Sequence, residues 1–131
     1  YTAYKIFKKN KFFGSGPKTY RVLSKKEQYA YNKYSYTTHP HNYYMQLLSE
    51  TGIFGLVFIL IGYISLLIIF LNNVFSKKYD KKKQNCYLIL IGGLLINFFP
   101  FMPTGNFFNN WNSILILIPV SLLLKVFYDG K

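Results

Sequence analysis

Residues 53–71 read IFGLVFILIGYISLLIIFL, a run of 19 residues without a charged side chain. As an α-helix this run is about 28 Å long, close to the roughly 30 Å thickness of the hydrocarbon core of a bilayer. We therefore predict a transmembrane helix over 53–71.

Two further apolar runs follow, and we predict spans at about 84–101 and 111–128. The first contains the apolar core 86–99 and is stopped by Pro100. The second contains Pro119, which should kink it and which membrane helices tolerate. The predicted fold class is all-α, a polytopic integral membrane fragment in which a basic loop outside the membrane precedes three transmembrane helices; the family resemblance described below implies that this loop is periplasmic.

Composition agrees with this class. The chain has 131 residues, of which 51% are hydrophobic, and a net charge of +12. Neither an ordinary soluble domain nor a disordered tail combines such apolar content with such basicity. Because the chain opens at Tyr1 without a methionine, we expect further spans upstream of it.

The orientation follows from residues 77–83, KKYDKKK, whose five lysines favour the cytoplasmic side. Alternation then places residues 1–46 and 100–110 outside. Residues 1–41 carry nine Lys or Arg against one Glu, which by charge alone would favour the inside. A long segment is translocated largely regardless of charge, and an anionic partner at the outer leaflet would explain its basicity.

Within the outer segment we expect an amphipathic helix at the interface over residues 1–11. Gly14–Pro17 should break any helix. Residues 20–23 suit either a strand turn or a short helix, and 24–38 suit an ordered loop. Tyrosines between lysines also occur in single-strand nucleic-acid sites, but the chain has no recognisable nucleic-acid module, so we expect no nucleic-acid partner.

The sequence HPHN, residues 39–42, precedes the first span. Pro40 disfavours a helical conformation at His39, and Asn42 is a good N-cap for a helix that begins after it. His41 would then lie at the positive end of a helix dipole, which attracts phosphate, and a neutral imidazole there could accept a proton from an attacking hydroxyl. On spacing alone, the favoured interpretation of His41 is a surface histidine that caps a helix or bonds a carbonyl. Two histidines without further ligands do not predict a metal site.

Gln46 and Glu50 are four residues apart and share a helix face. We place Glu50 where the helix enters the bilayer, either as an interfacial carboxylate bonded to another helix or in a functional role. It lies about 180° around a continuous helix from His41 and should not orient it. Gly52 and Gly55 should let another helix approach closely.

His41-Asn42, nine residues and then Gly52-Ile-Phe-Gly55 together resemble the signature of the bacterial O-antigen ligase and polymerase family. A second, weaker resemblance is Phe13-Gly14-Ser15-Gly16-Pro17, similar to a Phe-Gly-X-Gly-Pro segment ahead of the family histidine. The loop from Pro100 to Trp111 also looks like the relatives' last periplasmic loop. The resemblance implies one family domain that is truncated at its N-terminus, with residues 1–46 as the loop that carries the histidine and 47–131 as the last helices.

The resemblance implies an inverting, metal-independent glycosyltransferase of the bacterial inner membrane that needs no cofactor. Its donor would be a glycan on undecaprenyl pyrophosphate, and its acceptor lipid A–core or another glycan, among membrane lipids. His41 would be the catalytic residue. The predicted substrate-binding residues are Arg21, His39, Asn42, Gln46 and Glu50, and the structural motif residues are Gly14, Gly16, Gly52 and Gly55.

Three alternatives remain open at this level. A repeat-unit polymerase and a protein O-oligosaccharyltransferase would carry the same motif. A non-enzymatic membrane transport or lipid-binding module would need polar residues along its spans, where only Ser65, Asn97, Ser113 and Ser121 are scattered.

Overall fold

A computed structural model describes residues 1–32, 34–76 and 80–128, and in these ranges the chain is helical without a strand. The all-α prediction is therefore confirmed. In chain order the elements are α1 (Thr2–Lys9), α2 (Tyr20–Leu23), a 3-10 turn (Glu27–Tyr29), α3 (Tyr43–Glu50), α4 (Gly52–Val74), α5 (Lys81–Asn97) and α6 (Asn110–Tyr128).

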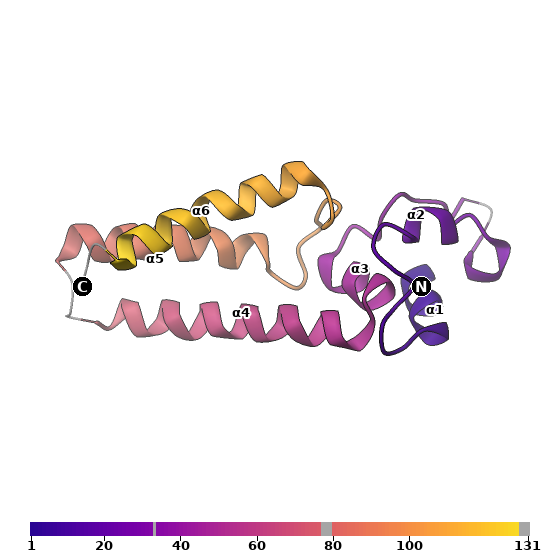
Figure 1. The fold of residues 1–131 in the computed structure, drawn as a ribbon, viewed down its shortest axis with the longest axis horizontal. Helices are drawn as coiled ribbons and strands as arrows, with labels where there is room; N and C mark the ends of the chain where they lie inside the picture. Colours follow the sequence, from indigo (N-terminus) through magenta and orange to yellow (C-terminus); the bar gives the residue numbers. More distant parts are fainter. Residues whose placement is uncertain (33, 77–79, 129–131) are drawn as a thin grey trace.

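The helices form two groups that follow one another along the long axis of the molecule. α4, α5 and α6 form an elongated bundle, and α1, α2 and α3 gather at one of its ends (Figure 1). The last turn of α4 and the first turn of α5 lie at the opposite end. The segment between α5 and α6 returns to the end that holds α3, as alternating spans require.

α4 is the one helix in the described ranges that is long and apolar enough to cross a membrane. It has 23 residues and extends beyond the predicted 53–71 at both ends. α6 is apolar but shorter over the residues whose side chains are described, Asn110–Val126, and it continues through Pro119.

α5 differs from the predicted 84–101 at both ends. It begins at Lys81, so part of the lysine run is helical. It ends at Asn97 because Pro100 disfavours the helical conformation at Phe99. The rest of the lysine run on which the orientation depends, residues 77–79, lies outside the described residues, as do 129–131 of the predicted cytoplasmic tail.

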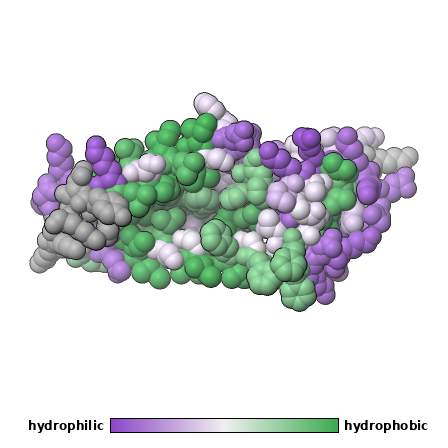
Figure 2. All heavy atoms as spheres, in the orientation of Figure 1, coloured by the Kyte–Doolittle hydropathy of each residue, from purple (hydrophilic) through white to green (hydrophobic). Residues whose placement is uncertain are grey.

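The surface of the bundle is apolar. Figure 2 shows a hydrophobic band along the middle of the molecule with hydrophilic residues at both ends. On α4 the side chains of Phe54, Phe58, Ile61, Ile64 and Ile68 are exposed. Apolar area exposed on this scale suits contact with lipid or with other helices better than contact with water.

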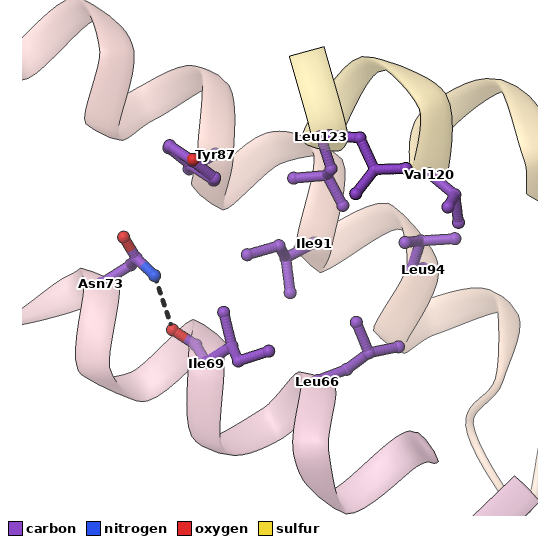
Figure 3. Close-up of a pocket in the computed structure, with 9 residues that line it drawn as sticks. Leu66, Ile69, Asn73, Tyr87, Ile91, Leu94, Val120 and Leu123 are labelled. Carbon is purple, nitrogen blue, oxygen red and sulfur yellow. Dashed lines mark hydrogen bonds between the residues drawn. The ribbon is translucent and has the colours of Figure 1, made fainter. Parts of the chain in front are cut away.

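An apolar cavity of about 360 Å³ separates α4 from α6 over the face of α5. Figure 3 shows Leu66 and Ile69 from α4, Ile91 from α5 and Leu123 from α6 pointing toward it. Asn73 lines one end, where its side-chain amide donates to the carbonyl of Ile69 over 2.9 Å. The three helices therefore leave an open apolar space within the bundle.

The end segment has a small core of its own. α1 is the predicted helix of residues 1–11, and its buried side chains are Thr2, Ala3 and Ile6. Ala3 and Ile6 pack with Tyr20 and Tyr29. Residues 20–23 form a helix, not a strand turn.

Candidate functional site

Asn42 begins α3 as predicted. Its side-chain oxygen accepts a hydrogen bond from the amide of Met45 over 3.0 Å. Asparagine is among the best residues for this position because it satisfies an amide that no helical carbonyl can reach. The side-chain nitrogen of Asn42 donates to the carbonyl of Pro100 over 2.6 Å. Asn42 thus ties the start of α3 to the loop before α6.

His41 is exposed immediately before this cap, with a left-handed backbone at φ +57°. This conformation costs a non-glycine residue about 1 kcal/mol, so the surroundings must hold it. One such contact is a hydrogen bond of 2.9 Å from the amide of Thr104 to the carbonyl of His41. The main chain of His41 is fixed while its imidazole stays accessible.

His39 lies against His41, with 4.2 Å between the ring centroids and 51° between the ring planes. Its Nδ1 is hydrogen-bonded with the Thr38 hydroxyl over 2.9 Å. Partial burial, and then the neighbouring His41, lower the pKa of His39 below its usual 6.5, against a backbone hydrogen bond with Thr104 that raises it. A lower pKa favours the neutral imidazole of His39, which packs against His41 without like-charge repulsion.

Gln46 is a buried link between α3 and the loop before α6. Its amide nitrogen donates to the side-chain oxygen of Asn106 over 2.9 Å, and its amide oxygen accepts from the amide of Phe107 over 2.9 Å. The same nitrogen donates to Glu50 over 2.9 Å, so the predicted shared face is confirmed. With its side chain 1% exposed, Gln46 positions the loop from inside the protein.

Glu50 is also buried, at the end of α3 away from His41. Its carboxylate accepts from Gln46 and, over 2.7 Å, from the amide of Tyr20 at the start of α2. The prediction placed Glu50 where a continuous helix enters the bilayer. In the structure the helix breaks at Thr51, and Glu50 is covered by the segment that includes Tyr20. The two hydrogen bonds compensate part of the cost of burying its charge.

The two glycine-containing motifs meet at this break. Gly14 and Gly52 both have left-handed backbones, at φ +67° and +71°. A Cβ on Gly52 would lie 2.2 Å from the carbonyl oxygen of Phe12, and one on Gly14 would lie 2.3 Å from the carbonyl carbon of Glu50. The close neighbour that Gly52 accommodates is thus the chain around Phe12 and Gly14, not another helix as predicted.

Backbone hydrogen bonds fasten this crossing. The amides of Ser15 and Gly16 donate to the last carbonyls of α3, and the carbonyl of Lys11 accepts from the first turn of α4. The pairs are Ser15 to Ser49 over 3.0 Å, Gly16 to Glu50 over 2.8 Å and Ile53 to Lys11 over 2.9 Å. Carbonyls that a helix end leaves without partners are thereby satisfied. A Cβ on Gly55 would lie 1.7 Å from the Oγ1 atom of Thr51, so the nearest neighbour of Gly55 is on its own helix turn.

Arg21 is exposed on α2. In the described residues its guanidinium makes no hydrogen bond or ion pair with His41. The structure therefore leaves this side chain accessible to a ligand without bringing it into contact with the histidines.

Sequence reasoning missed the loop between α5 and α6 as a part of the site. Asn106 bonds Gln46, Thr104 bonds His41, and Asn112 donates from its side chain to the hydroxyl of Tyr43. The asparagines and the glycine of this loop could have indicated an ordered turn, because such residues favour turns over helices. Among the described residues, no group of three or more His, Cys, Asp or Glu side chains is arranged to hold a metal ion.

The comparisons with known proteins agree with the motif. A family model described as O-antigen ligase matches residues 1–60. No curated protein and no solved structure gives a significant match to the chain. The matched residues include His41, Asn42 and all four motif glycines, and the match supports a membrane glycosyltransferase-type function in lipopolysaccharide biosynthesis. Residues 1–60 of this chain are therefore similar to the O-antigen ligase family.

Proposed function

We propose that the chain is part of a bacterial inner-membrane glycosyltransferase that moves a glycan from undecaprenyl pyrophosphate to a hydroxyl of lipid A–core. The observation that carries this proposal is the setting of His41. It is exposed, its main chain is held by Thr104, and only α3 separates it from the long apolar helix α4. A group held in this way can act on a substrate that is itself anchored in the membrane.

In the proposed reaction the imidazole of His41 accepts the proton of the acceptor hydroxyl. The acceptor oxygen forms a bond to the anomeric carbon of the donor sugar, and the bond from that carbon to the phosphate oxygen breaks. Undecaprenyl pyrophosphate leaves with the electron pair, and the anomeric configuration inverts. No metal takes part in this scheme. The amides at the start of α3 and the nearby basic residues attract the pyrophosphate.

We further propose three spans, with residues 1–46 on the periplasmic side. Support comes from the arrangement of the chain, because α1, α2, α3 and the loop between α5 and α6 occupy one end of the bundle. The lysines on α1 would then face anionic lipid or core phosphates at the outer leaflet.

The test is an in vitro reaction of the full-length enzyme in nanodiscs with a labelled undecaprenyl-pyrophosphate-linked glycan. Lipid A–core is offered in one reaction, and only further donor in the other. Labelled lipid A–core in the first reaction is the expected product. Glycan chains that lengthen on the donor carrier in both reactions would instead identify a repeat-unit polymerase. Failure to form either product would contradict the proposal.

Arg21 provides a narrower prediction. A guanidinium can hold a pyrophosphate through paired hydrogen bonds, and a hydrogen bond to a charged group contributes about 1.5–3 kcal/mol. We expect Arg21→Ala to weaken donor binding by about 10-fold or more while the KM for lipid A–core stays unchanged. Lys125→Ala removes the same charge from an exposed position in the last turn of α6 and serves as the control. Equal donor affinity in wild type and Arg21→Ala would remove Arg21 from the site.

A further inference from the structure

A second cavity, of about 330 Å³, lies beside the histidine motif. It lies between the end of α5, the loop that follows and the start of α6, it is open to the surface, and its lining includes Tyr43, Asn97, Thr104 and Asn112. Its lining is more polar than that of the cavity in the middle of the bundle, and its polar groups come from several segments. It is near the lower end of the size range of small-molecule sites.

Two of these polar groups have no partner. The Oδ1 atom of Asn97 and the Oγ1 atom of Thr104 are buried from solvent and make no hydrogen bond. Buried polar atoms are almost always satisfied in folded proteins, so an unsatisfied pair beside one cavity points to a missing partner. A ligand with hydroxyl groups would supply it, since a hydroxyl both donates and accepts.

The cavity is connected to His41 through Thr104. The amide of Thr104 donates to the carbonyl of His41 over 2.9 Å, and Thr104 is also one of the residues that line the cavity. Tyr43, two residues after His41, lines the same cavity and accepts a hydrogen bond from Asn112. A ligand in the cavity would therefore lie next to the segment that carries the proposed catalytic group.

The chemistry of the lining selects the ligand class. The described residues that line the cavity include no Lys, Arg, Asp or Glu, so a charged ligand would find no counter-charge there. Hydroxyl and amide groups stand beside apolar surface from Ile96 and Met102. A sugar ring has the matching character, with hydroxyls at its edge and C–H groups on its faces.

We propose that this cavity binds one neutral sugar ring of the glycan whose reacting end lies at His41. The assignment rests on the proposed function, and the ring could belong either to the donor glycan or to the acceptor core. Asn97 and Thr104 bind its hydroxyl groups directly. These two residues are then substrate-binding residues that the motif did not indicate.

The test measures equilibrium binding and transfer separately, with the full-length protein in nanodiscs. The probes are labelled undecaprenyl-pyrophosphate-linked glycan and labelled lipid A–core. Asn97→Leu and Thr104→Val each replace an unpartnered polar atom by an apolar group of similar size, and Ser121→Ala, on the exposed surface of α6, is the control. Each variant except the control should lose about 3- to 10-fold in affinity for one of the two probes, the loss of one hydrogen bond. Which probe is affected tells whether the ring belongs to donor or acceptor.

Melting temperature separates binding from folding. Removal of an unsatisfied buried polar atom should leave the melting temperature unchanged or raise it, so weaker binding in an equally stable protein supports the proposal. Wild-type affinity for both probes in both variants would overturn it, and so would a wild type that binds neither probe. Lower stability with equal losses for both probes would assign the polar atoms to protein packing and also overturn it. Binding that follows the expected pattern without any transfer by wild type would overturn the proposed function alone.

Discussion

His41→Ala should reduce the rate of glycan transfer by about 10²- to 10⁴-fold, the range that a positioned general base contributes. The imidazole is exposed at the start of α3, and its ring contact is His39. Removal of the ring takes away the proposed proton acceptor while the hydrogen bonds of Asn42 and Gln46 remain. The measurement is the initial rate of lipid A–core labelling at saturating donor and acceptor.

A second variant controls for the backbone. His41 has φ +57°, a conformation that alanine tolerates poorly and asparagine tolerates better. His41→Asn therefore keeps the left-handed turn without supplying a base of similar strength. Both variants should lose transfer, and His41→Asn should keep the melting temperature of the wild type. Wild-type rates in both would exclude His41 as the base.

Gly52→Ala should destabilise the protein by about 3 kcal/mol, since it combines a left-handed backbone with an overpacked contact. The added Cβ would lie 2.2 Å from the carbonyl oxygen of Phe12 and 2.7 Å from the amide nitrogen of Gly14, and neither backbone atom can rotate away. The crossing that joins the outer segment to α4 must then open or shift. Thermal unfolding of the full-length protein in detergent measures the effect.

Two further glycine variants test whether the backbone crossing causes the loss of stability. Gly14→Ala should destabilise similarly, because its Cβ would meet the backbone of Glu50 from the other side of the same crossing. Gly93→Ala, in α5, has no atom within 4 Å of the added group and should be neutral or stabilising. Melting temperatures that do not distinguish Gly52→Ala from Gly93→Ala would show that the crossing does not need glycine.

The sequence predicts the elements of this fold better than their contacts. The apolar run 53–71 identifies α4, and the pair Pro40 and Asn42 locates the start of α3, because span length and helix capping are local properties. α5 begins within the lysine run, at Lys81, and ends before Pro100, so both of its ends differ from the predicted 84–101. Only one of the three predicted spans meets the criteria of length and apolarity in the described residues.

The sequence predicts contacts in the site between residues that are close together in the chain. Spacing placed Gln46 and Glu50 on one face, and they do bond each other. What spacing cannot give is the third partner, here the amide of Tyr20 for Glu50 and Asn106 for Gln46, since each comes from a distant part of the chain. Because of these partners, Gln46 and Glu50, both predicted to bind substrate, are buried and connect α3 to other parts of the chain. Spacing also could not predict the close approach of Gly14 and Gly52, because these glycines are far apart in the sequence.

The most direct test of the account is the lipopolysaccharide made by a bacterial strain that lacks its own O-antigen ligase. The full-length gene is introduced as wild type and as His41→Asn, and equal amounts of both proteins in the membrane are verified. The account predicts that the wild type restores the ladder of O-antigen-bearing lipopolysaccharide on a gel and that His41→Asn does not. A ladder of equal intensity from both genes would contradict the role of His41, and a ladder from neither would contradict ligation onto lipid A–core.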